Sequence, residues 1–124
     1  MSDDDVLALL EDALAFGDTL VVVRSGAAIA EVTGGPLRRG QEWLTLGDEG
    51  AGRSHVHVRM ADVQALRFRQ TEGRNAALDV LDGGASVILS LSFRGTNAAR
   101  AERFDAERLA KIRARFGHLE GTAL

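Results

Sequence analysis

The sequence predicts a single α+β domain spanning residues 1–124, with an antiparallel β-sheet core of about seven strands between an N-terminal and a C-terminal helix. Three observations lead to this fold class. Apolar residues recur at helical spacing near both ends of the chain. Short β-branched or alternating segments follow one another between those ends. Short turns join the segments, and strands joined in this way pair antiparallel because a parallel return needs a long crossover.

The first helix is expected from Asp3 to Phe16, where apolar side chains recur after an acidic first turn. Gly17 and Asp18 then end the helix. Strands are expected over residues 19–24, 27–33, 42–46, 55–59, 64–70, 76–81 and 86–93.

Two turns mark hairpins in the predicted sheet. Ser25-Gly26 separates the first two strands, and Asp82-Gly83-Gly84 separates the last two. Glycine suits such turns because it tolerates positive φ. The stretch from Gly47 to Ser54 contains three glycines and is expected to be a mobile loop.

The last helix is expected over the arginine-rich stretch from Ala98 to Phe116. Its apolar stripe would consist of Phe104, Leu109, Ile112 and Phe116.

Composition excludes several classes of function. The net charge of −3, the absence of tyrosine and the single tryptophan argue against a nucleic-acid partner. The chain has no cysteine, so a disulfide, a thiolate nucleophile and an iron–sulfur site are all excluded. The acidic start and the lack of a long apolar run predict a cytoplasmic protein without a membrane segment.

Catalytic motifs are also missing from the sequence. The glycines do not form a P-loop or a dinucleotide-binding fingerprint, and no Gly-x-Ser-x-Gly or His-Glu-x-x-His pattern occurs. Glu31, on a predicted strand, is either a perturbed carboxylate or an ordinary exposed glutamate. No residue is assigned a catalytic role, and the chain is not expected to be an enzyme.

His55 and His57 stand two residues apart on a predicted strand, so their side chains share one face. Two imidazoles on one face can bind a transition metal or ligate haem iron. The alternative is a solvent-facing strand with polar side chains, since His118 is far away in the sequence.

Arg59, Arg67 and Arg69 lie on consecutive predicted strands, and the last two share a face. Clustered guanidinium groups suit carboxylate or phosphate ligands. Cross-strand pairing with Glu72, Asp79 or Asp82, or plain solvation, is the alternative.

From Ser25 onward the chain resembles one repeat of the HemS-type haem-utilisation proteins of bacterial iron metabolism, and their shorter ChuX/HutX relatives. The order and spacing of several short motifs agree with that family. They are Ile29-Ala30-Glu31-Val32-Thr33-Gly34, Gly40-Gln41-Glu42-Trp43-Leu44, His55-Val56-His57-Val58-Arg59, Ala65-Leu66-Arg67-Phe68-Arg69, and Ala77-Leu78-Asp79-Val80-Leu81-Asp82 running into Leu91-Ser92-Phe93-Arg94-Gly95.

The resemblance implies a cytoplasmic homodimer that binds haem and passes it on. In the family pattern a ligand histidine precedes the threonine of the first motif, and here that position is Val32, which cannot coordinate iron. His57 matches the family histidine of the later strand, with His55 as its neighbour. The resemblance therefore implies His57 or His55 as the iron ligand and Arg67, Arg69 and Arg59 near the haem propionates.

Three hypotheses follow from the sequence. The first is a non-enzymatic haem-binding or haem-trafficking protein. The second is a dimeric interaction or ligand-binding domain of the same fold that has lost haem binding and takes another apolar ligand or a protein. The third, a haem-degrading enzyme, needs a delivered electron and a positioned ligand that the sequence does not reveal.

Overall fold

The computed structural model describes residues 2–48 and 54–121 and shows an α+β architecture built on two antiparallel sheets. Residues 49–53, in the predicted mobile loop, lie outside the described residues. The helices are α1 (Asp3–Ala15), α2 (Ala106–Phe116) and the short 3-10 helices η1 (Met60–Asp62) and η2 (Gly117–Leu119). The strands are β1 (Thr19–Ser25), β2 (Ala28–Thr33), β3 (Leu37–Arg39), β4 (Trp43–Gly47), β5 (His55–Arg59), β6 (Ala65–Arg69), β7 (Ala77–Leu81) and β8 (Val87–Phe93).

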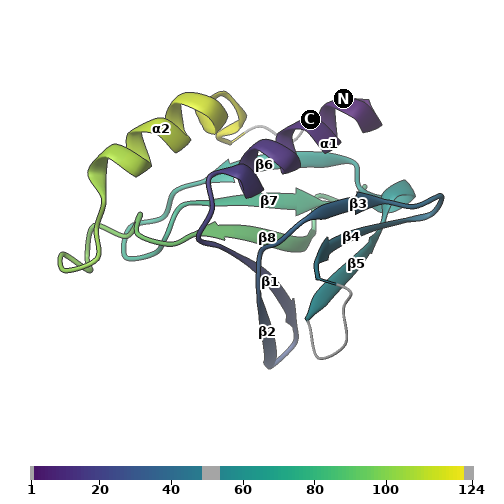
Figure 1. Cartoon of the computed structure of the whole chain (residues 1–124), viewed down its shortest axis with the longest axis horizontal. Coiled ribbons are helices and arrows are strands. Elements are labelled where there is room, and N and C mark those ends of the chain that lie inside the picture. Colours follow the sequence, from purple (N-terminus) through teal and green to yellow (C-terminus); the bar gives the residue numbers. More distant parts are fainter. Residues whose placement is uncertain (1, 49–53, 122–124) are drawn as a thin grey trace.

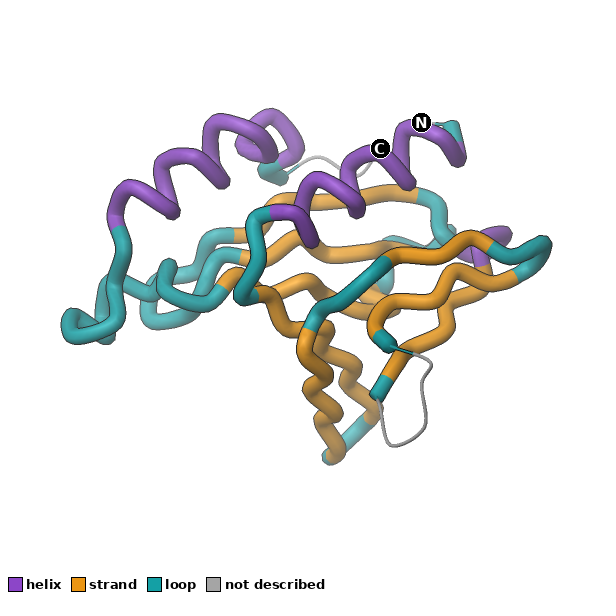
Figure 2. Tube along the Cα trace, viewed as in Figure 1, coloured by secondary structure: helices purple, strands orange, loops and turns teal. Residues whose placement is uncertain are grey.

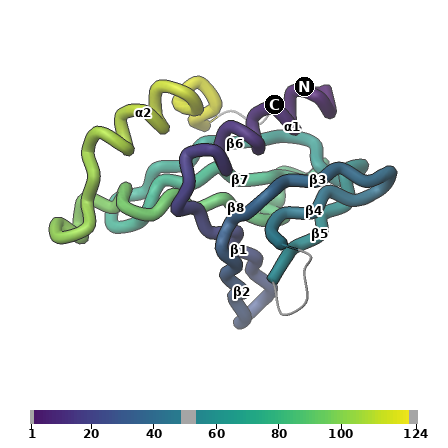
Figure 3. The backbone as a smooth tube through the Cα atoms, viewed as in Figure 1, coloured from purple at the N-terminus to yellow at the C-terminus, as the bar shows by residue number. Residues whose placement is uncertain are grey.

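The strands form a five-stranded sheet in the order β2-β1-β8-β7-β6 and a three-stranded sheet in the order β3-β4-β5. Both main helices lie on one side of the larger sheet, and the β1–β2 hairpin extends away from them (Figures 1 and 2). The smaller sheet lies beside that hairpin (Figure 3). None of the helices in residues 2–48 and 54–121 is long and apolar enough to cross a membrane.

The core lies between the helices and one face of the larger sheet. Val21, Leu91, Leu78 and Phe68 stand in register across β1, β8, β7 and β6, and each is at most 1% exposed. The helices add Val6, Leu9, Leu10, Ala13, Ile112 and Phe116, and the smaller sheet adds Leu44, Leu46 and Val58. Side chains alternate along a strand, so the opposite face of the larger sheet faces away from this core.

The predicted helices are confirmed at one end of the chain and shortened at the other. A capping box between Ser2 and Asp5 starts α1, and the chain turns at Gly17 and Asp18, both with positive φ. The last helix begins at Ala106, capped by Asp105, and not at Ala98 as expected. Residues 98–104 form turns instead.

The expected seven strands become eight in the described residues, because β3 has only three residues and its sequence gave no strand signal. The hairpin at Asp82 is confirmed, but its left-handed residue is Ala85, with φ of 61°, and neither Gly83 nor Gly84. Arg59 lies in the smaller sheet, whereas Arg67 and Arg69 lie in the larger one. Consecutive strands in sequence are therefore not neighbours at this point.

Replacing Gly47 with alanine is expected to cost about 2 kcal/mol of unfolding free energy, measured by urea denaturation. Gly47 has φ of 108°, and a Cβ there would stand 2.6 Å from the Ser54 carbonyl oxygen. Gly73→Ala is the control, because Gly73 also has positive φ but no heavy atom within 4 Å of the added Cβ. Equal losses in the two variants would contradict a steric role for Gly47.

Candidate functional site

The outward face of the five-stranded sheet carries a row of polar side chains. Across β2, β1, β8, β7 and β6 the residues in register are Glu31, Val22, Ser90, Asp79 and Arg67. The described helices pack on the other face of this sheet (Figure 1). Glu31 is exposed at one end of the row, and Arg67 is half-buried at the other. A candidate site therefore lies on the sheet surface itself.

Asp79 and Ser90 are the buried members of that row, and the Asp79 side chain is only 1% exposed. Arg67 Nη2 donates to Asp79 Oδ2 at 2.9 Å, Arg69 donates to both carboxylate oxygens, and Ser90 Oγ donates to Oδ1 at 2.6 Å. Burial by itself would raise the pKa of Asp79. The hydrogen bonds from Arg69, Ser90 and Arg67, with the positive charge of Arg69, outweigh that effect and hold the pKa below its ordinary value.

Arg67 and Arg69 are therefore placed together, as the shared face predicts, and pair with Asp79. This pairing is one of the alternatives that the sequence leaves open. Each arginine side chain remains 33% exposed, so contact with a ligand is not precluded.

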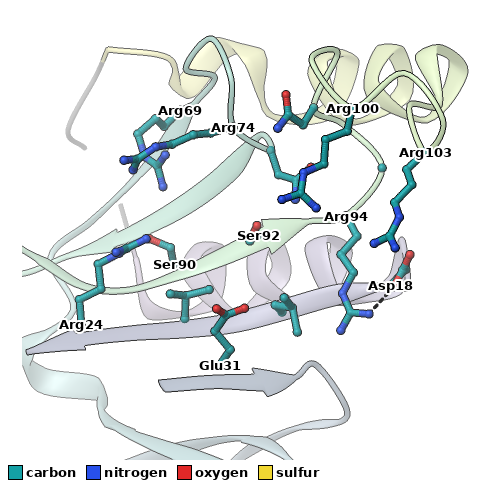
Figure 4. A pocket seen from close by; sticks show the side chains of 15 residues that line it. Asp18, Arg24, Glu31, Arg69, Arg74, Ser90, Ser92, Arg94, Arg100 and Arg103 are labelled. Atoms are coloured by element: carbon teal, nitrogen blue, oxygen red, sulfur yellow. Dashed lines mark ion pairs between the residues drawn. The ribbon is translucent and has the colours of Figure 1, made fainter. Parts of the chain in front are cut away.

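A groove of about 830 Å³ lies over this face, and we call it the arginine groove. Six arginines and two carboxylates contribute to its walls (Figure 4). Leu20 and Val22 of β1 contribute apolar surface. Around Ser90 and Ser92, Arg24 and Glu31 lie on one side and Arg94, Arg100 and Arg103 on another (Figure 4). The arginines are Arg24, Arg69, Arg74, Arg94, Arg100 and Arg103.

Sequence reasoning missed most of this groove. It singled out Arg69 but assigned residues 98–116 to one helix, which would have placed Arg100 and Arg103 on a solvated helical surface. A usable signal was present, since Arg74 and Arg94 flank the ends of two strands expected to pair in a hairpin. Antiparallel neighbours bring those ends to the same edge of the sheet.

A second cavity, of about 720 Å³, lies against the smaller sheet and contains His57. Trp43 and Ile88 line it, Trp43 being 41% exposed, and the Arg59 guanidinium carbon stands 4.9 Å from the Trp43 ring centroid. We call it the His57 cavity.

The two histidines share a face of β5, as predicted, with ring centroids 4.7 Å apart. Thr45 Oγ1 is 2.8 Å from His57 Nδ1, and the Asp48 carbonyl oxygen is 3.1 Å from His55 Nδ1. Only His57 contributes to the cavity wall. His118 lies in η2, on a different element.

The described residues contain no group of three or more histidine, aspartate or glutamate side chains able to hold a bare metal ion. Haem iron differs in this respect, because the porphyrin supplies four ligands and the protein needs to supply one. With its proton on Nδ1, His57 donates to Thr45 and leaves Nε2 able to coordinate. His57 therefore fits the role of a single axial ligand to haem iron.

The predicted site residues therefore fall into two places. His57 and Arg59 line one cavity, Arg69 lines the groove, and His55 and Arg67 are not in either wall. Arg59 also pairs with Glu42 at 3.3 Å and lies 3.9 Å from Asp62. The two carboxylates offset part of the charge that Arg59 would offer to a propionate.

The fold and the two cavities define an antiparallel α+β domain with one ligand-sized hollow over the larger sheet and another against the smaller sheet. No protein-family model matches the chain, and no curated protein does. A crystal structure of protein AGR_C_4470 from Agrobacterium tumefaciens is similar, with a TM-score of 0.71, 16% sequence identity, and coverage of 97% of this chain and 70% of that one. At that identity the similarity establishes the fold alone. The HemS-type resemblance stays a prediction.

Proposed function

We propose that this chain is a non-enzymatic haem-binding protein that uses His57 as its axial ligand in the His57 cavity. The observation that carries the proposal is the hydrogen bond between His57 Nδ1 and Thr45 Oγ1. It holds the imidazole of a residue that lines the cavity and leaves Nε2 without a hydrogen bond to any described residue. A metal-ligating histidine commonly has its second nitrogen held in this way.

The cavity offers apolar surface beside charged groups, since Asp62 and Asp82 line it together with Trp43 and Ile88. Its volume of about 720 Å³ falls in the usual range for small-molecule sites. The exposed Trp43 ring and the Ile88 side chain offer apolar contact to a porphyrin face. Arg59 offers a cation to one propionate.

A haemin titration followed by Soret absorbance tests this proposal. Wild type is expected to give a saturable, red-shifted band at about one haem per chain, and His57→Ala is expected to lose it. His55→Ala and His118→Ala are matched controls that each remove one imidazole but no residue of the cavity wall, and both are expected to retain the band.

Thr45→Val supplies a second readout. Valine keeps the shape of threonine but cannot hold His57 Nδ1, so haemin affinity is expected to fall about tenfold or more while His57 remains present. A weak band that is unchanged in His57→Ala would overturn the haem proposal.

A second candidate is a dimeric ligand-binding domain of the same fold that does not take haem. Val32 favours it, because valine occupies the position of the family's other ligand and packs partly buried against the core. The edge strand β2 is a surface to which a second copy could pair, since five of its six residues are exposed and β1 is its only partner among the described strands. Failure of the haemin titration would favour this candidate.

A further inference from the structure

We propose that the arginine groove is a separate binding site for a small organic anion that carries two or more carboxylate or phosphate groups. The inference goes beyond the haem proposal and does not depend on it, because it uses different residues. Arg69 is its only residue in common with the predicted haem site.

Charge is the first reason. Of the six arginines, Arg69 pairs with Asp79, and Arg94 lies 3.5 Å from Asp18. The other four make no ion pair or side-chain hydrogen bond with any residue in 2–48 or 54–121: Arg24, Arg74, Arg100 and Arg103. Six arginines against the two carboxylates Asp18 and Glu31 leave the groove with an excess of positive charge, and a bound anion would offset that excess.

Preorganisation is the second reason. The two loops that carry Arg74, Arg94, Arg100 and Arg103 are tied together by hydrogen bonds. Thr96 N donates to Asn75 Oδ1 at 3.3 Å, and Asn97 Nδ2 donates to the Gly73 carbonyl at 3.0 Å.

The buried Thr96 Oγ1 completes this link, because it accepts from Ala76 N at 2.8 Å and donates to the Phe93 carbonyl at 2.6 Å. The backbone that carries these arginines is therefore held in place, so fewer groups lose conformational freedom when a ligand binds.

The groove's size and surface indicate the kind of anion. Its volume of about 830 Å³ suits a small molecule, and Leu20 and Val22 offer apolar contact between the arginines. None of the described residues that line it is aromatic, so bases of a single-stranded nucleic acid would find no stacking surface. Carboxylate and phosphate ligands both match the guanidinium fork.

Isothermal titration calorimetry at low ionic strength tests the site, with citrate as the carboxylate probe and inorganic pyrophosphate as the phosphate probe. At least one probe is expected to bind saturably at one site per chain. Whether citrate or pyrophosphate binds shows whether the site prefers carboxylate or phosphate groups. Binding is expected to weaken as salt is raised, because the groove is open.

The double variant Arg74→Gln/Arg100→Gln is expected to weaken binding about tenfold or more. Neither side chain has a described partner, so the fold should be retained, which thermal unfolding verifies. Arg39→Gln/Lys111→Gln removes the same charge outside both cavities and is the matched control. His57→Ala is expected to bind as wild type does, so a failed haem proposal leaves this result intact.

Two outcomes would overturn the proposal. The first is the absence of saturable binding by both probes, or equal binding by the groove and control variants. The second is binding of a single-stranded oligonucleotide that depends on Arg74 and Arg100 while neither small anion binds, which would place a polymer in the groove.

Discussion

Replacing Asp79 with asparagine is expected to lower the free energy of unfolding by about 3 kcal/mol at neutral pH. Asparagine has the same shape, but it carries no charge and presents an amide donor toward the guanidinium groups. Arg67 and Arg69 would then lie side by side without a counter-charge. The loss falls at the lower end for a broken buried ion pair because both arginines retain contact with solvent.

The effect of Asp79 depends on pH in a defined direction. Its pKa in the folded protein lies below the ordinary value of 3.8. The charged carboxylate therefore stabilises the fold fully above that ordinary value, and the contribution is lost as pH falls through the folded pKa. The difference between wild type and Asp79→Asn should be constant near neutrality and shrink in acid.

Urea denaturation at neutral and acidic pH measures both effects. Asp62→Asn is the control, because Asp62 is 62% exposed and lies 3.9 Å from its arginine, and it should change stability by less than about 0.5 kcal/mol. A loss for Asp79→Asn no greater than this control would show that the buried carboxylate does not hold the two arginines.

Replacing Arg108 with alanine is expected to lower the free energy of unfolding by about 3 kcal/mol. Arg108 on α2 donates to four backbone carbonyls, those of Phe16, Gly17, Asp18 and Arg94, at 2.7 to 3.1 Å. Three of these carbonyls, those of Phe16, Gly17 and Asp18, follow α1, where a cation also interacts favourably with the helix dipole. One side chain thus joins the start of α2 to the end of α1.

Arg108→Lys should recover less than half of that loss, because an ammonium group lacks the planar fork that reaches several carbonyls at once. Arg103→Ala is the matched control, since Arg103 makes no side-chain hydrogen bond with any described residue. Urea denaturation gives the stabilities. Faster amide hydrogen exchange confined to the backbone near Gly17 and Gly95 would show that the stability is lost where Arg108 contacts the carbonyls. Full recovery of stability in Arg108→Lys would contradict the role of the guanidinium fork.

The helix α1 and the sequential hairpins could be predicted because their signals are local. The capping box at Ser2 and the positive-φ residues Gly17 and Gly26 each act within a few residues of their own position. The common face of His55 and His57 follows in the same way from strand alternation.

The start of α2 could not be predicted because tertiary contacts override helix propensity there. Residues 98–104 contain alanine and arginine, which favour a helix. Asn97 instead donates to the Gly73 carbonyl, and its side-chain oxygen accepts from Ala99 N at 3.0 Å. Asp105 N donates to the Gly95 carbonyl at 2.8 Å, so the helix begins only after that bond.

Taken alone, the sequence determined the fold class, the antiparallel hairpins and the surface that carries His55 and His57, since each depends on residues near one another in the chain. The tertiary structure decided that β1 pairs with β8, that the strands divide into two sheets, and that Asp79 is buried beneath Arg67 and Arg69. It also gathered arginines from β1, β6 and two loops into one groove. The physical reason is that pairing between distant strands depends on burying a common core, and one stretch of sequence does not contain its partner.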